Sequence, residues 1–330
     1  MRLIIRLAAV LFALALVVVA ATGFLLWDFG RAGPLTADRV VTIERGDGLS
    51  TIAARLEGEG VIDSAWLFTA AIYLSADPGA MRFGDYAIPA RASGRDAFDI
   101  IASGRTVPLE ITIPEGLTSQ QIVERLLADE RLSGDITTVP PEGALLPETY
   151  FIDRGSARQA LIDRMAAAMD ATLAELWVAR ADGLPLATPE EALILASIIE
   201  KETAQADERD LVASVFVNRL NRGMPLQTDP TVIYALTEGS GSLGRPLLRS
   251  DLEIDSPYNT YRIDGLPPGP IANPGRAAIA AALNPAQSDF LYFVADGTGG
   301  HAFARTLDEH NRNAAEWRRI RDGEADGAGE

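Results

Sequence analysis

The sequence predicts an α+β protein in which an N-terminal transmembrane helix precedes a small α/β domain and a larger mixed α/β domain. Three observations support this fold class: a long apolar run at the N-terminus, alternating strand and helix patterns after it, and a length of 330 residues. Because a typical domain has ~150 residues, this length favours about two folded units. Hydrophobic residues make up 48% of the chain, which is enough to form real cores.

The composition excludes several classes of protein. The net charge is −17, and no block rich in Lys and Arg occurs. Because a protein that binds nucleic acid needs a basic face to neutralise phosphates, we expect no nucleic-acid partner. The chain has no cysteine, which excludes disulfide frameworks, thiolate nucleophiles and Cys-ligated zinc.

The N-terminus is typical of a membrane anchor. Residues 7–27 are nearly all apolar, and a helix needs ~20 such residues to cross ~30 Å of hydrocarbon. Arg2 and Arg6 precede the run, so the positive-inside rule keeps residues 1–6 in the cytoplasm. A cleaved signal peptide is the alternative, but its apolar core usually has only about 7–15 residues. We therefore expect an anchor that is retained, with the rest of the chain outside the cytoplasm.

A strand–turn–helix pattern occurs twice after a linker at residues 28–38. Residues 42–56 read TIERGDGLSTIAARL, and residues 112–126 read TIPEGLTSQQIVERL. In each stretch a glycine-containing turn precedes a helix that Ser50 or Thr118 can cap. Repeated units of this kind are usually structural or serve for interaction. We place the main domain boundary after them, near residue 140.

A third helix is expected to be buried. Thr188 can cap it, Pro189 suits its first position, and Glu191 can complete a capping box. The following segment, residues 192–199, is apolar on nearly every side. A helix of this pattern belongs in a core rather than on a surface.

Two carboxylates, Glu200 and Glu202, end this helix. Burying a carboxylate is costly unless it is paired or functional. Burial also raises the pKa, which a general acid for glycosidic cleavage requires. Glu202 falls on the face of Leu195 and Ile199, but this argument discriminates weakly because the helix is apolar nearly all round. An ordinary solvated helix end accounts for these residues equally well.

Polar loops follow this helix. Residues 224–234, 256–261 and 265–275 combine turn formers with Asn, Gln, Tyr and Thr. Amides can bond sugar hydroxyls, and aromatic rings can cover the apolar faces of sugars, so these loops suit a glycan cleft; plain loop chemistry is the alternative.

The histidines give no sign of a metal site. His301 and His310 are the only two in the chain, and no ligand cluster surrounds them in the sequence. His301 suits a hydrogen-bonding role in a cleft or a structural role equally. A Ser/His/Asp triad stays open as an alternative, although the sequence contains no G-x-S-x-G nucleophile elbow. The glycine-rich residues 296–300 lack the Lys-Ser/Thr of a phosphate-binding loop, and we expect no metal and no cofactor.

Together, these segments resemble a known protein family. The chain resembles the MltG (YceG-like) endolytic murein transglycosylases over most of the stretch from Leu145 to Asn311. The matching segments, in the family's order, are LPETYF, LASIIEKET, ERDLVASVFVNRLNRGMPLQTDPTVIYAL, SPYNTYRIDGLPPGPIANPG and LYFVADGTGGHAF. The segment near residues 41–67 is LysM-like and, with the anchor, agrees with the family's layout.

The resemblance implies an activity. Family members cleave the β-1,4 bond between N-acetylmuramic acid and N-acetylglucosamine inside nascent glycan strands and leave a 1,6-anhydro end, which would terminate strand elongation. The family's essential glutamate lies in the EKET segment. We assign it to Glu202, because Glu-Thr resembles the Glu-Ser of other lytic transglycosylases, and keep Glu200 as the alternative. The candidates for positioning the sugar are Gln227, Asp229, Asn259, Tyr261 and His301.

The resemblance also implies an organisation and a location. We expect a LysM-like, peptidoglycan-interacting region at 39–140, a catalytic domain at 141–320 and a disordered tail at 321–330. The chain would be a single-pass protein of the inner membrane with its catalytic domain in the periplasm. Its partners would be peptidoglycan strands, with peptidoglycan synthases as a further candidate. Two alternatives stay open: a muramidase that uses water, and a non-catalytic scaffold that binds peptidoglycan.

Overall fold

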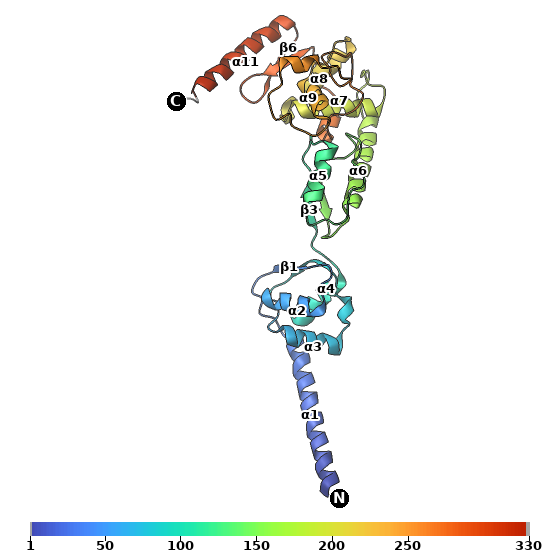
Figure 1. Ribbon diagram of the computed structural model, residues 1–330, viewed down its shortest axis with the longest axis vertical. Coiled ribbons are helices and arrows are strands. Elements are labelled where there is room, and N and C mark those ends of the chain that lie inside the picture. The colour runs from blue at the N-terminus through green and yellow to red at the C-terminus, as the bar shows by residue number, and fades with distance from the viewer. Residues whose placement is uncertain (1, 328–330) are drawn as a thin grey trace. The chain divides into compact units, whose positions relative to one another are not determined.

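The computed structural model describes residues 2–327, and these form two compact units (Figure 1). Unit 1 contains the residues up to Ile111 and the segment Phe151–Ser156, whereas unit 2 contains Thr112–Tyr150 and the residues from Ala157 onward. Both helices and strands occur, so the predicted mixture of α and β structure is confirmed. The boundary that we expect near residue 140, between a peptidoglycan-interacting region and a catalytic region, stays a prediction.

The chain begins with α1 (Arg2–Gly30), a helix that is long and apolar enough to cross a membrane. It contains the whole predicted span at 7–27, and its last turn reaches the core of unit 1. There the ring of Phe29 is 3% exposed and lies 5.8 Å from the ring of Phe68. The end of the apolar helix is therefore part of the core of unit 1.

Unit 1 packs three short helices against a two-stranded antiparallel sheet. After α1 its elements are β1 (Arg39–Ile43), α2 (Leu49–Gly58), α3 (Ala65–Ser75), the 3-10 helix η1 (Pro78–Ala80), β2 (Gly84–Ile88) and α4 (Gly94–Ser103). The sheet pairs Val41 with Tyr86. Tyr86 is fully buried, as are Leu56, Ile72 and Ile101 from the three helices, which makes one continuous core.

A second two-stranded sheet joins β3 (Leu109–Thr112) to β4 (Thr149–Ile152). Thr112 and Thr149 face each other across it, with their hydroxyl oxygens 2.9 Å apart. Residues 113–148 connect these two strands and include α5 (Ser119–Ala128).

Unit 2 is mainly helical. Its further elements are α6 (Arg158–Val178), α7 (Pro189–Glu202), η2 (Ala206–Glu208), α8 (Arg209–Asn221), α9 (Asp229–Thr237), η3 (Arg249–Glu253), α10 (Arg276–Leu283), β5 (Tyr292–Ala295), β6 (His301–Ala304) and α11 (Leu307–Gly327). The antiparallel pair β5–β6 aligns Phe293 with Phe303. Helix α11 overlaps the segment 321–330, for which we expect a disordered tail, and residues 328–330 lie outside the described residues.

Helix α7 is the centre of unit 2, as its apolar pattern predicts. Helices α6, α8, α9 and α10 all contact it. Ala192, Leu195, Ala196 and Ile199 are fully buried in the resulting core. Because this helix is enclosed on several sides, the direction in which its C-terminal carboxylates point is set by rigid packing.

The N-terminus of α7 differs in one detail from the capping box that the sequence suggests. The hydroxyl of Thr188 accepts a hydrogen bond from the Glu191 amide at 3.3 Å. The carboxylate of Glu191, however, accepts from the amide of Ala187 at 2.6 Å. One half of the box is thus present, and the other half satisfies a neighbouring amide.

Candidate active site

A cleft with a volume of about 440 Å³ opens in unit 2 at the C-terminal end of α7. Its walls come from α7, α8, the start of α9, β5 and α11, together with the loop around Tyr261. The polar and charged side chains that line it are those of Glu202, Arg219, Gln227, Asp229, Tyr261, Tyr292 and His310. Three of the predicted sugar-positioning residues, Gln227, Asp229 and Tyr261, therefore lie in one cleft with Glu202.

Glu202 is the last residue of α7, and protein atoms surround its carboxyl group on most sides. Thr228 donates a hydrogen bond from its hydroxyl to Oε1 of Glu202. Burial raises the pKa of Glu202 to about 6, and the negative charge of Asp229 acts in the same direction. The Thr228 hydrogen bond and the charges of His301 and Arg219 lower it by less. The carboxyl group of Glu202 thus stays protonated to a higher pH than that of an ordinary glutamate.

Glu200 has different surroundings from Glu202. Its carboxylate accepts a hydrogen bond from the amide of Gly275 at 3.0 Å, and Gly275 is the N-cap residue of α10. Burial raises the pKa of Glu200 as well. Among the described residues, however, those that line the cleft include Glu202 and not Glu200. The contact with Gly275 ties α7 to the start of α10, which is a structural role.

Two loops are joined to each other beneath the cleft. The amide of Gln227 donates to the carbonyl of Thr260 at 3.0 Å, and the amide of Thr228 donates to the Thr260 hydroxyl at 3.1 Å. On the cleft side, the hydroxyl of Tyr261 donates to Oδ1 of Asp229 at 2.6 Å. Gln227 has a φ of +51°, a left-handed conformation that costs a residue with a side chain roughly 1–2 kcal/mol. These bonds hold Gln227 in that conformation and set the position of Asp229 and Tyr261.

Asn259 is fully buried and serves the loop rather than the cleft wall. Its amide nitrogen donates to the carbonyls of Leu252 and Ile254, each at 2.9 Å, and its oxygen accepts from the amide of Tyr261 at 3.1 Å. The side chain of Asn259 is therefore occupied by backbone groups, and it fixes the turn that presents Tyr261.

His301 is held by Glu208, a residue that the sequence did not single out. Nδ1 of His301 lies 2.7 Å from Oε2 of Glu208, and the His301 amide donates to Oε1 of the same carboxylate at 2.9 Å. His301 lies close enough to Glu202 for a positive charge on its imidazole to lower the pKa of Glu202. Glu208 thus orients the imidazole of His301, which is not among the described residues that line the cleft.

Arg219 is a second residue that the sequence analysis missed. It is 8% exposed, and its guanidinium donates to the carbonyls of Leu291 at 2.7 Å and Leu226 at 2.8 Å, with a longer bond to Pro225 at 3.3 Å. It also lies 5.1 Å from the ring centre of Tyr292. Arg219 therefore connects two walls of the cleft: the segment before α9 and the segment that leads into β5. The sequence sign that could have revealed its role is a single arginine within the largely apolar stretch of α8.

Tyr292 and His310 complete the side of the cleft next to α11. Their rings are stacked with centres 5.3 Å apart. Burial lowers the pKa of His310, so its imidazole is neutral near pH 7. A flat aromatic surface of this kind suits the apolar face of a sugar ring.

Comparison with known proteins places the chain in a family. The model of the YceG-like family matches residues 41–316. The chain belongs to the YceG-like family.

Its relatives include two curated bacterial proteins, each named endolytic murein transglycosylase. That of Streptococcus pneumoniae serotype 2 (strain D39 / NCTC 7466) is 32% identical over 326 residues, which cover 84% of this chain and 58% of that protein. That of Bacillus subtilis (strain 168) is 43% identical over 174 residues, which cover 52% of this chain and 47% of that protein. The chain thus spans about half the length of the curated relatives it matches.

A solved structure also resembles this chain. The crystal structure of a yceG-like protein from Listeria monocytogenes matches with a TM-score of 0.54 and 33% sequence identity. The match covers 83% of this chain and 98% of the Listeria chain.

Proposed function

We propose that the chain is a membrane-anchored endolytic lytic transglycosylase that cleaves the bond between N-acetylmuramic acid and N-acetylglucosamine in nascent peptidoglycan. Membership of the YceG-like family and the names of its relatives support this activity. The observation that carries it is Glu202: a carboxyl group with a pKa of about 6, hydrogen-bonded to Thr228 and lining a cleft of about 440 Å³. Such a group can donate a proton near neutral pH.

The mechanism needs one carboxyl group in two roles. Protonated Glu202 donates its proton to the glycosidic oxygen, and the bond from C1 of the muramic residue to that oxygen breaks. The Glu202 carboxylate then takes the proton from the C6 hydroxyl of the same sugar, whose oxygen attacks C1. The products are a free N-acetylglucosamine hydroxyl and a 1,6-anhydro end, and Glu202 is protonated again. Because no water enters, the carboxylate spacing that separates ordinary glycosidases does not apply.

The other cleft residues have supporting roles in this proposal. Gln227, Asp229 and Tyr261 hold the sugar, and the Asp229 carboxylate stabilises the positive charge that develops at C1. His301, oriented by Glu208, adds a polar contact at the edge. Asn259 acts indirectly by shaping the loop before Tyr261.

The remaining parts of the chain suit a wall enzyme attached to a membrane. The apolar helix α1 would be a retained inner-membrane anchor with its N-terminus in the cytoplasm, which Arg2 and Arg6 support. The packing of Phe29 in the core of unit 1 favours retention. The LysM-like region at 39–140 would bind peptidoglycan, and the catalytic region would lie at 141–320 in the periplasm.

The products of digestion test the reaction. Purified, uncrosslinked glycan strands treated with the full chain in detergent should yield internal fragments whose muramic ends carry the anhydro mass, lighter by one water than a reducing end. Mass spectrometry of the fragments measures this directly. Asp229 is a second carboxylate in the same cleft, and it makes a muramidase with an activated water the rival reaction. Reducing muramic ends would establish that rival, and binding without cleavage would establish the scaffold.

The raised pKa predicts how cleavage depends on pH. The reaction starts from protonated Glu202, whose pKa is raised to about 6 by burial. The initial rate at low substrate concentration should therefore be nearly constant below about pH 5, fall to about half its maximum near pH 6 and fall about tenfold per pH unit well above that. Rates measured on strands between pH 5 and 8 check this, with strand binding measured in parallel. A rate that rises through pH 6 to 7 would mean that the essential group works in its ionised form.

A further inference from the structure

Helix α3 presents an uncovered apolar face next to α1. Trp66 is 74% exposed, Tyr73 is 70% exposed and Leu74 is 53% exposed. The helix sequence, AWLFTAAIYLS, contains no charged residue. A helix on a water-facing surface normally carries charges on its outer side, so this face needs a covering.

An apolar groove runs between α3 and the last third of α1. Its volume is about 400 Å³. Phe24 and Leu25 of α1 form one wall, and Trp66, Leu67 and Leu74 of α3 form the other. Among the described residues that line the groove, Thr22 carries a hydroxyl and none carries a charge, so the groove lacks the converging polar groups that a polar ligand requires and its chemistry suits hydrocarbon.

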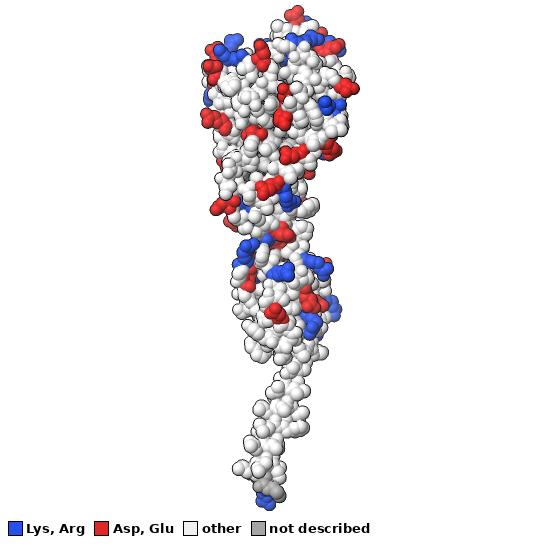
Figure 2. Space-filling view, turned by 90° about the vertical axis from the view of Figure 1, so that its right-hand side faces the viewer, with Lys and Arg blue, Asp and Glu red and all other residues white. Residues whose placement is uncertain are grey.

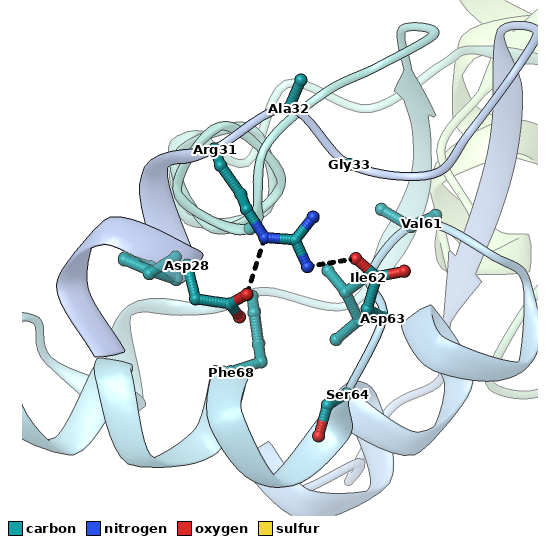
Figure 3. A pocket seen from close by; sticks show the side chains of 11 residues that line it. Asp28, Arg31, Ala32, Gly33, Val61, Ile62, Asp63, Ser64 and Phe68 are labelled. Atoms are coloured by element: carbon teal, nitrogen blue, oxygen red, sulfur yellow. Dashed lines mark hydrogen bonds and ion pairs between the residues drawn. The ribbon is translucent and has the colours of Figure 1, made fainter. Parts of the chain in front are cut away.

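The position of α3 against α1 is set by specific contacts. The side chain of Arg31, just after α1, bonds to Asp28 at 2.7 Å and to Asp63 at 2.5 Å. Asp63 directly precedes Ser64, the N-cap residue of α3, and Figure 3 shows the guanidinium between the two carboxylates. With the Phe29–Phe68 ring contact, this ion-pair bridge holds the start of α3 to the end of α1.

The length of the anchor indicates the depth of the groove. A helix crosses the ~30 Å hydrocarbon core with about 20 residues. Counted from Leu7, the first residue of the apolar run, the outer edge of the hydrocarbon falls near Leu26. Phe24 and Leu25 would then lie just inside the outer leaflet, and Trp27, which is 62% exposed, would lie at the headgroup level.

The surface charge agrees with this depth. In the space-filling view, the part of unit 1 that adjoins α1 is free of coloured acidic and basic residues on the face shown, whereas both kinds occur farther from α1 (Figure 2). Trp and Tyr are the residues enriched where a protein meets lipid headgroups, and α3 exposes one of each.

We infer that α3 is an interfacial helix: it inserts Trp66, Tyr73 and Leu74 into the outer leaflet of the membrane, and lipid acyl chains fill the groove between α3 and α1. This inference rests on the proposed anchor. Unit 1 would then be attached to the bilayer at two places, by the span and by α3, which restricts its tilt on the membrane surface.

The absence of cysteine permits a direct test in the full chain. Single-cysteine variants carry a fluorescent label and are reconstituted into phosphatidylethanolamine–phosphatidylglycerol vesicles that contain nitroxide lipids. Trp66→Cys and Tyr73→Cys report on α3. Val17→Cys, in the middle of α1, reports on the anchor, and Val40→Cys, 53% exposed on β1, is the water-facing control. All four sites are exposed, so the substitutions leave the cores intact, and thermal unfolding of each variant verifies this.

Labels on α3 should be quenched about twofold or more by nitroxides near the headgroups, and Val40→Cys should not be. If Val17→Cys is quenched by deep nitroxides while the α3 labels match Val40→Cys, the anchor stands and the interfacial helix is refuted. If Val17→Cys is not quenched either, the anchor itself fails, and the inference fails with it. If the α3 labels become shielded from water without quenching by lipid nitroxides, a protein covers this face, and the lipid assignment is wrong.

Discussion

Replacement of Glu202 by glutamine should lower the rate of strand cleavage by at least about 10³-fold, because general acid–base catalysis contributes typically 10²–10⁴-fold and Glu202 serves in both proton transfers. Glutamine keeps the size of the side chain and an oxygen that can accept the Thr228 hydrogen bond. Binding of glycan strands should therefore persist. The measurement is the initial rate of fragment release, together with strand binding by the same protein.

Glu200→Gln is the matched control, since it makes the same chemical change two residues away on the same helix. The Gly275 amide that bonds to Glu200 can donate equally well to a glutamine oxygen. We expect this variant to cleave at close to the wild-type rate. If Glu200→Gln is inactive and Glu202→Gln is active, the essential carboxyl is Glu200. If both variants keep full activity, the assignment of the site to this helix end is wrong.

The burial of α7 could be predicted from sequence because it depends on a local pattern. A run of residues that is apolar on every side has to be enclosed, and Leu195 and Ile199 are indeed fully buried. Glu200 and Glu202 could be recognised as candidates because they directly follow this apolar run on the same helix. The choice between them could not be made from that pattern, because it depends on what lies opposite: Thr228 beside Glu202 and Gly275 beside Glu200.

Capping shows how far local sequence reasoning extends. Thr118 caps α5 as expected, and Gln121 completes its box by accepting from the Thr118 amide at 3.0 Å. The prediction that Ser50 caps α2 is wrong, since α2 begins at Leu49 with Gly48 as its N-cap residue and no side-chain cap. The two stretches differ at the N-cap position itself. The residue that matches Thr118 is Gly48, which has no side-chain oxygen to accept a hydrogen bond.

The walls of the cleft could not be predicted because distant segments assemble them. Arg219 bonds to the carbonyl of Leu291, a residue 72 positions away. Neither helical periodicity nor a turn signal encodes that contact. The same holds for Glu208 and His301, which are 93 positions apart. Glu208 and Arg219 both lie inside a segment that resembles the family, but their partners lie in another segment, so the pattern of their own segment does not reveal these contacts.

Replacement of Arg219 by methionine should destabilise unit 2 by about 3–5 kcal/mol, because the buried carbonyls of Leu226 and Leu291 lose their donor and each unsatisfied buried acceptor costs about 1–3 kcal/mol. Lost packing on Tyr292 adds to this. Denaturant unfolding of the full chain in detergent measures the change. Arg222→Met is the matched control on the exposed end of α8, and a surface change of this kind stays within about 0.5 kcal/mol.

The same substitution should also move the pH profile of whatever cleavage remains. The positive charge of Arg219 lowers the pKa of Glu202, so its removal raises that pKa and shifts the fall in rate to higher pH. A merely structural role would reduce the rate without shifting the profile. If Arg219→Met unfolds at the same denaturant concentration as Arg222→Met and keeps the wild-type profile, Arg219 neither holds the cleft walls together nor tunes Glu202.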